Sequence, residues 1–377
     1  MVGVILFLAE RRNWGVEPKL NSNTHGSRAT GTQATALASF YPGLEGGRRL
    51  RSLVEHSGAI RLADSLVVDG HDEAVARVVT HIHSDHVKEL RRSIRELPLI
   101  AATPLTLDLL AAMGYSVPTG KRLALPYGRS IVIDGVRLTL LRANHVPGAA
   151  EVLVELSDGT RLGYTGDFKL PGTEIMEDLD VLVVDATYGR PEYRRPWQGE
   201  IEYLLADIVD EALIHGPVAL YGYNGKVEEV MHILRRMQVV APFIVPRKRF
   251  KLVDVLMRHG IDLGEVYPAD SREAAEIRKN GWYVEFRHFR EWRRAGGPGT
   301  HILLTGWEFR APYRRLGVGN KLVVSFSDHA DYEQLMSYIR EAKPRLLVVD
   351  AARGGEVARF FAKHVSEVLG IRALAMP

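Results

Sequence analysis

The sequence predicts an α/β fold in which a second α/β domain is inserted into the first. Short strand patterns alternate with helical patterns from about residue 55, longer helices interrupt this alternation, and the strand pattern then returns. The length of 377 residues also exceeds the ~250–300 residues at which single cores stop growing. We therefore expect an N-terminal extension over residues 1–54, a first domain from residues 55–190 and 320–377, and an inserted domain over residues 191–319.

The first domain is expected to begin with strands that lead into a polar loop. We interpret residues 59–70 as a strand pair and residues 76–82 as a buried strand, because both stretches are rich in aliphatic and β-branched residues. Residues 103–114 have helical spacing, with Thr103 as the side-chain cap and Pro104 at the first helical position. This order places the polar stretch after residue 80 at the end of a buried strand.

Two hairpins are expected next. Residues 130–143 and 150–167 each carry an Asp-Gly pair between two β-rich runs, which is a strong signal for a tight hairpin turn. Residues 178–189 have the pattern of another buried strand, and residues 200–216 and 226–237 have the pattern of long helices. The change from short strands to long helices marks the start of the insert.

The composition limits the classes of site and partner. Cysteine is absent, so disulfides and cysteine nucleophiles are excluded and any metal ion must be held by histidines and carboxylates. The net charge of +3 is small, but arginine dominates the basic runs at residues 247–251, 287–294 and 310–315. Guanidinium groups bind phosphate in a bidentate fashion, although a solvated helix face is the simpler interpretation of each run alone.

The expected location follows from what the chain lacks. No apolar run is long enough to span a membrane, and the first residues have neither the positive region nor the cleavage site of a signal peptide. The absence of cysteine suits a reducing compartment. We therefore expect a cytoplasmic protein with no membrane partner.

The stretch "VVTHIHSDHVKEL" holds more metal-type side chains than one zinc ion needs. His81 and His83 are two residues apart on extended backbone, so both can point to the same side and bind one metal ion. Asp85 and His86 follow where the chain turns and can face a second ion. Without a metal ion, these polar groups would be left unpaired beside a buried strand at a large cost. The stretch therefore predicts half of a site for two ions about 3.5–4 Å apart.

The remaining ligands must come from later in the chain. His145 in "ANHVPGA", Asp167 in "YTGDFK" and His329 in "FSDHADY" each follow a predicted strand and precede a small or turn residue. Active-site residues are often carried on such strand-end loops. We therefore expect these three side chains to complete the metal site, and we interpret the isolated histidines elsewhere as ordinary core or surface residues.

These motifs, taken in order, resemble the metallo-β-lactamase superfamily, and "FSDHAD" with "VVDATYG" resembles its β-CASP branch of nucleases. The resemblance runs from about residue 55 to the C-terminus and implies an αββα sandwich with an inserted α/β β-CASP domain. It also implies two zinc ions as cofactors and a role for each matching residue. One ion would be held by His81, His83 and His145 and the other by Asp85, His86 and His329, with Asp167 bridging them, Asp69 orienting ligands and Asp185 assisting the second site.

The implied chemistry is hydrolysis of a phosphodiester bond. The two metal ions would activate water and neutralise the charge that develops on the phosphate. Asp167 would hold the nucleophile in line with the phosphorus, with Asp85 and His329 completing the catalytic centre. Asp185 or a nearby protonated histidine would assist the leaving oxygen.

Several phrases favour DNA over RNA as the substrate. The stretches "ANHVPGA", "TGDFK", "DATYGRPEY", "YGYNGKVEE" and "LLTGWEF" are most similar to the DNA cross-link-repair nucleases of the Artemis type. RNA-acting members usually carry another histidine at a later strand end, where this chain has Asp350 and Ala351. In contrast, "FSDHADY" is more similar to RNA-acting and prokaryotic members. We expect a DNA 5′ exonuclease in repair, with an RNA-processing nuclease as the alternative.

Two further features bear on substrate binding. Gly225 and Lys226 begin a predicted helix, whose exposed N–H groups and lysine charge could bind a terminal 5′ phosphate. Trp307 could stack on a base, but we expect it in the core, where tryptophan is more often found. A zinc hydrolase for a small thioester or lactam is another alternative, which the insert of about 130 residues with its basic runs disfavours. A degenerate binding module would need a broken ligand set, and this set looks complete.

Overall fold

The computed structural model describes residues 53–317 and 319–377 of the chain. The extension expected over residues 1–54 lies outside the described residues, apart from its last two. These two already belong to the fold, because Val54 is buried and forms an antiparallel bridge with Ile60.

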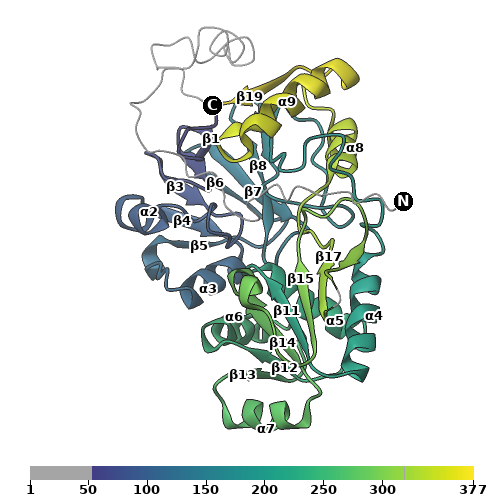
Figure 1. Cartoon of the computed structure of the whole chain (residues 1–377). Coiled ribbons are helices and arrows are strands. Elements are labelled where there is room, and N and C mark those ends of the chain that lie inside the picture. The colour runs from purple at the N-terminus through teal and green to yellow at the C-terminus, as the bar shows by residue number, and fades with distance from the viewer. Residues whose placement is uncertain (1–52, 318) are drawn as a thin grey trace, which may run out of the picture. The chain divides into compact units, whose positions relative to one another are not determined.

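A five-stranded sheet begins the first domain. Its strands pair in chain order; β1 and β2 are antiparallel, and the later pairs are parallel. The helices α2 (Leu90–Glu96) and α3 (Pro104–Ala112) contact β4 of this sheet (Figure 1). The strands are β1 (Ile60–Ala63), β2 (Leu66–Val68), β3 (Ala76–Val78), β4 (Leu99–Ala102) and β5 (Arg122–Ala124).

A seven-stranded sheet forms the second layer, in the order β19-β18-β10-β9-β8-β7-β6. Its β6–β9 end is antiparallel and its β9–β19 end is parallel. The helices α8 (Tyr332–Ala342) and α9 (Ala351–Leu369) belong to this half of the domain. The strands are β6 (Ser130–Ile133), β7 (Val136–Arg142), β8 (Ala150–Glu155), β9 (Arg161–Tyr164), β10 (Val181–Val184), β18 (Leu346–Asp350) and β19 (Ala373–Met376).

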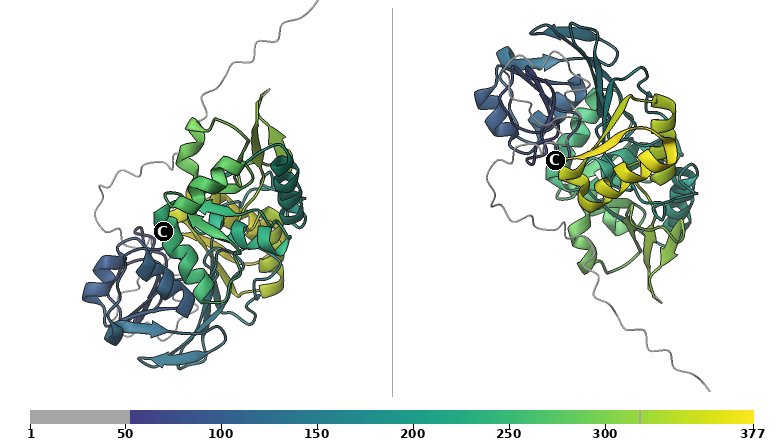
Figure 2. Two further views of the ribbon diagram at one scale, coloured as in Figure 1. Left: turned by 90° about the horizontal axis from the view of Figure 1, so that it is seen from below. Right: turned by 90° about the horizontal axis from the view of Figure 1, so that it is seen from above.

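The two sheets and their helices form the expected αββα arrangement. Helices α2 and α3 lie on one side and α8 and α9 on another, with strands between them (Figures 1 and 2). One hydrophobic core joins the layers, since Ile100 of β4 and Leu182 of β10 belong to the same buried cluster. This confirms the fold class that the sequence predicts.

The insert forms a third sheet of seven strands, in the order β13-β12-β14-β11-β15-β17-β16. Its strands are parallel except for β16. The strands are β11 (Val218–Gly222), β12 (Phe243–Val245), β13 (Val266–Pro268), β14 (Val284–His288), β15 (Thr300–Leu304), β16 (Tyr313–Arg315) and β17 (Lys321–Val324). The helical segments are α4 (Ile201–Ile214), α5 (Lys226–Arg236), α6 (Arg247–Arg258), α7 (Arg272–Asn280) and the short 3₁₀ helix η3 (Phe289–Arg294).

The third sheet extends past the boundary expected at residue 319. β17 (Lys321–Val324) pairs with β15 and β16, so the chain returns to the first domain only after Val324. The sequence could not show this, because a buried strand has the same pattern in either domain.

Local signals in the sequence correctly predict several elements. Thr103 caps α3 by accepting a hydrogen bond from the backbone N–H of Thr106. Asp134 and Gly135 both have positive φ, as a tight two-residue turn between β6 and β7 requires. Within the described ranges, no helix combines the length and the apolar character needed to cross a membrane.

Candidate metal centre

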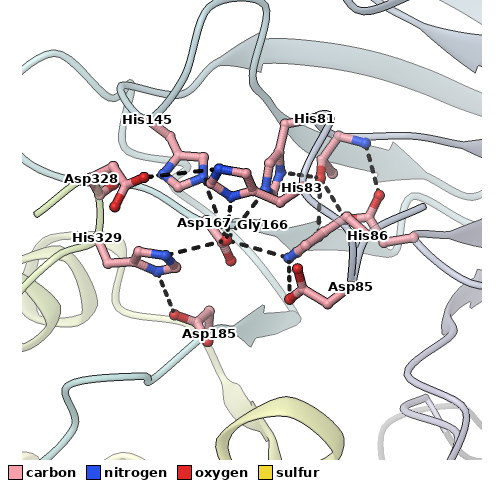
Figure 3. Close-up of polar contacts among 12 residues, drawn as sticks. His81, His83, Asp85, His86, His145, Gly166, Asp167, Asp185, Asp328 and His329 are labelled. Carbon is pink, nitrogen blue, oxygen red and sulfur yellow. Dashed lines mark hydrogen bonds and ion pairs between the residues drawn. The ribbon is translucent and has the colours of Figure 1, made fainter. Parts of the chain in front are cut away.

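Asp167 lies at the centre of a cluster of five histidines (Figure 3). Its carboxylate is buried, and its Oδ2 atom faces a ring nitrogen of each histidine. The distances from this oxygen are 3.3 Å to His81 Nε2, 3.3 Å to His86 Nε2, 3.5 Å to His145 Nε2, 3.7 Å to His329 Nε2 and 4.0 Å to His83 Nδ1. The structure therefore brings together every histidine that the sequence assigns to the site.

The cluster has the spacing and the unpaired atoms of a metal site. Two ligands held about 2.0–2.1 Å from one tetrahedral zinc ion lie about 3.3 Å from each other. Asp167 Oδ2 lies 3.3 Å from the Nε2 atoms of both His81 and His86. Both Nε2 atoms are buried without a hydrogen-bond partner in the described part of the chain, which is costly unless a ligand satisfies them. These residues therefore fit a bound metal ion.

The loop after β3 supplies the first ligands because of its backbone geometry. His81 and His83 are separated by one residue, and both rings reach the same oxygen of Asp167. The chain then turns, since the backbone N–H of His86 donates to the carbonyl of His83 at 3.1 Å. This turn brings the ring of His86 back towards Asp167.

Asp69 contacts the cluster from outside. Its Oδ2 lies 2.6 Å from His86 Nδ1, and its Oδ1 accepts a hydrogen bond of 2.8 Å from the backbone N–H of Thr80. A carboxylate in this position fixes the proton on Nδ1 and leaves Nε2 available to a metal ion. This geometry supports the orienting role that the family resemblance implies for Asp69, which stays a prediction.

Two further carboxylates lie beside the histidines. Asp85 Oδ2 is 3.2 Å from His86 Nε2, so it can share an ion with that ring. Asp185 Oδ2 is 3.5 Å from His329 Nδ1, and the backbone N–H and hydroxyl of Thr187 both donate to its carboxylate. Asp185, Asp167 and His329 also offer ligand atoms that all lie within 4.8 Å of one another, so Asp185 could itself contribute to a metal site.

Burial and charge divide the histidines into two electrostatic types. Burial lowers the pKa of His81 to about 4 and that of His145 well below its ordinary value, so both rings are neutral and able to bind a metal ion. For His329, burial lowers the pKa, but the carboxylates of Asp167, Asp185 and Asp328 together outweigh it and raise the pKa to about 9. His86 likewise has a raised pKa, because three carboxylates outweigh its burial. Positive charge on these two rings balances the carboxylates that a metal ion would otherwise neutralise.

Several residues around the cluster were missed by sequence reasoning. The backbone carbonyl of Asn224 lies 2.9 Å from His83 Nε2, and that of Asp328 lies 2.7 Å from His145 Nδ1. The signal for Asp328 was its place directly before His329. The contact from Asn224 has no sequence signal, because a backbone carbonyl is present at every residue.

Lys226 occupies a different environment from the one expected. Its ammonium group is buried and lies 3.0 Å from Asp328 Oδ1. Burial raises the pKa of Asp328, but Lys226 and the neighbouring histidines together outweigh this effect and hold the pKa well below its ordinary value. The phosphate-binding role of Gly225 and Lys226 stays a prediction, and Lys226 would have to share its charge between a phosphate and Asp328.

Trp307 corrects another expectation. We expected this side chain in the core, but it is 51% exposed, and its ring packs edge-on against Tyr188 at 5.0 Å. It follows β15 on a loop, and Tyr188 lies between its ring and that of His329, so the core packing typical of tryptophan does not apply here.

Comparisons with known proteins place this site in a family context. Residues 63–239 match the family model described as "Beta-lactamase superfamily domain". A protein of Acidianus ambivalens, described as "Uncharacterized protein in lig 3'region", is 45% identical over 141 residues, which are 37% of this chain and all of that protein.

Other relatives match a larger share of this chain, and their names describe proteins that act on DNA or RNA. The human DNA cross-link repair 1A protein is 26% identical over 75% of this chain but only 28% of its own length. Probable RNase MJ4 of Methanocaldococcus jannaschii is 22% identical over 72% of this chain and 80% of its own length. The chain thus spans about a quarter of several curated relatives, among them DNA ligase 6 of Arabidopsis thaliana at 27% of its length.

A solved structure shows the same fold. A protein of unknown function from Enterococcus faecalis V583 has a TM-score of 0.51 at 14% sequence identity, over 74% of this chain and 76% of that chain. At this identity the likeness concerns the fold alone.

Proposed function

Because this chain belongs to the metallo-β-lactamase superfamily, in its β-CASP nuclease branch, we propose that it is a zinc-dependent phosphodiesterase that cleaves nucleic acid. Within that activity we propose a 5′ exonuclease acting on DNA in repair. The main observation behind this proposal is that five imidazole rings surround one buried oxygen of Asp167. Such a cluster suits metal ions. The insert provides a second domain next to this cluster.

The ligands fall into two groups that share Asp167. In our assignment the first ion would be held by His81, His83 and His145, whose ligand atoms and that of Asp167 all lie within 4.8 Å of one another. The second ion would be held by Asp85, His86 and His329; the rings of His86 and His329 both face Asp167, and Asp85 faces His86. When bound, these ions would activate water and neutralise the charge on the phosphate oxygens.

Side chains of the protein would assist proton transfer to the leaving oxygen. Without a bound metal ion, burial lowers the pKa of His329, but the carboxylates of Asp167, Asp185 and Asp328 together raise it to about 9. Asp185 lies on the far side of that ring, 3.5 Å from Nδ1, and can hold its orientation. Because His329 would give a ring nitrogen to the second metal ion, assistance to the leaving oxygen is better assigned to Asp185 or to another protonated histidine nearby.

Two observations support DNA rather than RNA. Three cross-link repair 1A relatives are matched by name, and the late histidine typical of RNA-acting members is absent at the end of β18. Asp350 lies there instead, buried and paired with Arg353 at 2.6 Å, where its side chain caps α9. This position therefore has a structural use in this chain and no free ligand atom directed at the metal cluster.

An RNA-processing nuclease is the second candidate. The match to Probable RNase MJ4 covers most of both chains, whereas the match to the human repair protein covers 28% of that protein. The "FSDHADY" stretch also favours RNA-acting or prokaryotic members. Both candidates use the same metal cluster, so the substrate distinguishes them.

The decisive experiment compares matched end-labelled strands of DNA and RNA. Each strand would carry a 5′ phosphate, a 5′ hydroxyl or a blocked 5′ end, and the products would be resolved by length. Stepwise loss from 5′-phosphorylated DNA supports the proposal. Preferential cleavage of RNA would favour the second candidate, and internal cuts on blocked strands would exclude an exonuclease.

Variants of the cluster test the assignment of the ligands. His83→Ala and Asp167→Asn should each reduce cleavage by more than about 100-fold, because loss of a direct ligand costs more than loss of an outer group. Bound metal, measured by elemental analysis, should fall with activity. His215→Ala removes an exposed histidine after α4 and serves as the control. Full activity and metal content in either cluster variant would contradict the assignment.

A further inference from the structure

Exposed aromatic side chains lie at the edge of the third sheet that meets the metal cluster. Trp307 follows β15 and is 51% exposed, and Tyr223 follows β11 and is 46% exposed. The two strands are parallel neighbours, so their carboxyl ends lie at the same edge of the sheet. In open α/β sheets this edge is where ligands bind.

Trp307 is held in a fixed relation to the metal ligand His329. Its ring centroid is 5.0 Å from that of Tyr188, and the Tyr188 centroid is 6.2 Å from that of His329, so Tyr188 lies in contact with both the tryptophan and the metal ligand. The neighbouring Gly306 permits this approach, because a Cβ there would collide with the hydroxyl of Tyr188. An exposed tryptophan is thus placed beside the reaction centre by tight packing beneath it.

A buried guanidinium group ties the two loops together. Arg195 donates 2.9 Å hydrogen bonds to the carbonyls of both Gly306 and His329, and its guanidinium lies 4.3 Å from the ring centroid of Tyr188. The loop of Trp307 therefore cannot move far without disturbing the loop of the metal ligand. A rigid exposed aromatic ring loses little entropy on stacking, which favours a binding role over a passive one.

Tyr223 is fixed beside a different ligand. Its ring is stacked on Phe289 at 3.8 Å between centroids, and the carbonyl of the next residue, Asn224, contacts His83. Arg290 is exposed next to Phe289, with its guanidinium 6.0 Å from the phenyl ring. This side of the centre thus combines an exposed ring with a cation that can meet a phosphate.

We propose that Trp307 and Tyr223 are stacking platforms for unpaired bases on the two sides of the cleaved phosphodiester. The inference rests on the proposed nuclease function and names its substrate form, a single-stranded end. A base inside a duplex is stacked on its neighbours and offers no free face, whereas an unpaired base can stack on an aromatic ring. Because every base has a π-face, these platforms would accept any sequence.

The test is a cycle between protein and substrate variants. Binding of 5′-phosphorylated single-stranded DNA to the full-length, metal-loaded protein would be measured by fluorescence anisotropy, with non-hydrolysable phosphorothioate linkages in the strand so that no turnover occurs. A second strand of equal length would carry abasic sites at its 5′ end. Wild-type protein should bind the normal strand at least about tenfold more tightly than the abasic strand. Trp307→Ala should reduce that difference and leave the part that Tyr223 contributes.

Two variants make the result specific. Trp307→Phe keeps an aromatic face and should retain most of the discrimination against the abasic strand. Trp282→Ala removes a tryptophan that is 47% exposed but precedes β14 at the opposite edge of the same sheet, and it should behave as wild type. Tyr223→Ala should reduce discrimination at a different abasic position from Trp307→Ala.

The outcomes separate this inference from the proposed function. If wild-type protein cleaves nucleic acid but Trp307→Ala still discriminates against the abasic strand as wild type does, the platform is excluded and the nuclease stands. If wild-type protein binds a blunt duplex as tightly as the single strand, the single-stranded preference is excluded. Absence of cleavage of any strand by metal-loaded wild type would instead contradict the proposed function itself.

Discussion

Buried carboxylates in this chain differ in what they face. Asp167 faces five imidazoles and Asp328 faces the ammonium group of Lys226, and both have pKa values held well below the ordinary range despite their burial. Glu151 on β8 is buried as completely, but its partner is the hydroxyl of Tyr338 at 2.7 Å. Its Oε2 has no hydrogen-bond partner among the described residues, and burial raises its pKa well above 4.5.

Glu151→Gln should therefore stabilise the protein at alkaline pH. A carboxyl group with a raised folded pKa binds more protons when folded than when unfolded, so its ionisation destabilises the fold as pH rises above about 4.5. The amide of the variant cannot ionise, so the variant does not lose stability in this way as the pH rises. The loss that it avoids is about 1.4 kcal/mol for each unit by which folding raises the pKa of the carboxyl group. Urea unfolding at a series of pH values should show the gain of the variant growing from pH 5 to pH 8.

A neighbouring residue on the same strand provides the control for this prediction. Glu155 lies four residues away on β8 and is exposed, so Glu155→Gln should change the free energy of unfolding little at any pH. A gain for Glu151→Gln that does not vary with pH would show that its charge is not the cause.

Among the secondary-structure elements of the insert, α5 begins beside the metal cluster. The loop before it gives the Asn224 carbonyl to His83, and the first residue of the helix, Lys226, pairs with Asp328. Between them Gly225 has a φ of 86°, a conformation that residues with a Cβ rarely adopt. A Cβ there would lie 2.9 Å from His83 Nε2 and 2.8 Å from Val146 Cγ1.

Gly225→Ala should weaken metal binding without unfolding the protein. The added methyl group would push the ring of His83 away from the Asn224 carbonyl, and loss of such an outer contact typically costs about 10–100-fold in metal affinity. Zinc affinity would be measured by competition with a chromophoric chelator. Gly281→Ala is the matched control, because Gly281 also has positive φ, at 73°, but open space around its Cβ position.

The sequence predicted those residues of the candidate site that follow a recognisable buried strand. His81, Asp167 and His329 could be found because each follows a buried strand, and such strands are recognised by composition alone. The contacts made by Asn224 and Arg195 could not be found, since they depend on how two domains dock and involve backbone carbonyls. The boundary after Val324 was missed for the same reason, because strand order within a sheet is not encoded in local pattern.

In the described part of the molecule, the insert is joined to the first domain through buried polar contacts around the metal cluster. Lys169, two residues after Asp167, is buried and lies 2.6 Å from Glu229 of α5. Breaking a buried ion pair of this kind costs about 3–5 kcal/mol. The position of the insert and the order of the metal ligands should therefore depend on each other.

Metal removal should consequently destabilise the insert as well as the first domain. A metal ion at about a thousand times its Kd contributes about 4 kcal/mol to the folded state, a shift of roughly 10 °C in the midpoint of thermal unfolding. The described tryptophans, Trp197, Trp282, Trp292 and Trp307, all lie between residue 191 and the end of β17, so their fluorescence reports on the insert.

The measurement compares thermal unfolding with and without a chelator in a Trp14→Phe background, which leaves only the tryptophans of the insert. Tryptophan fluorescence and far-ultraviolet circular dichroism should give the same midpoint of thermal unfolding. The chelator should lower the midpoint measured by each method by the same amount. The coupling arises because His83 of the first domain contacts the carbonyl of Asn224 in the insert, and because Asp328 of the first domain pairs with Lys226 of the insert. A chelator that lowers the circular dichroism midpoint but leaves the fluorescence midpoint in place would show that the insert is stable without the metal centre.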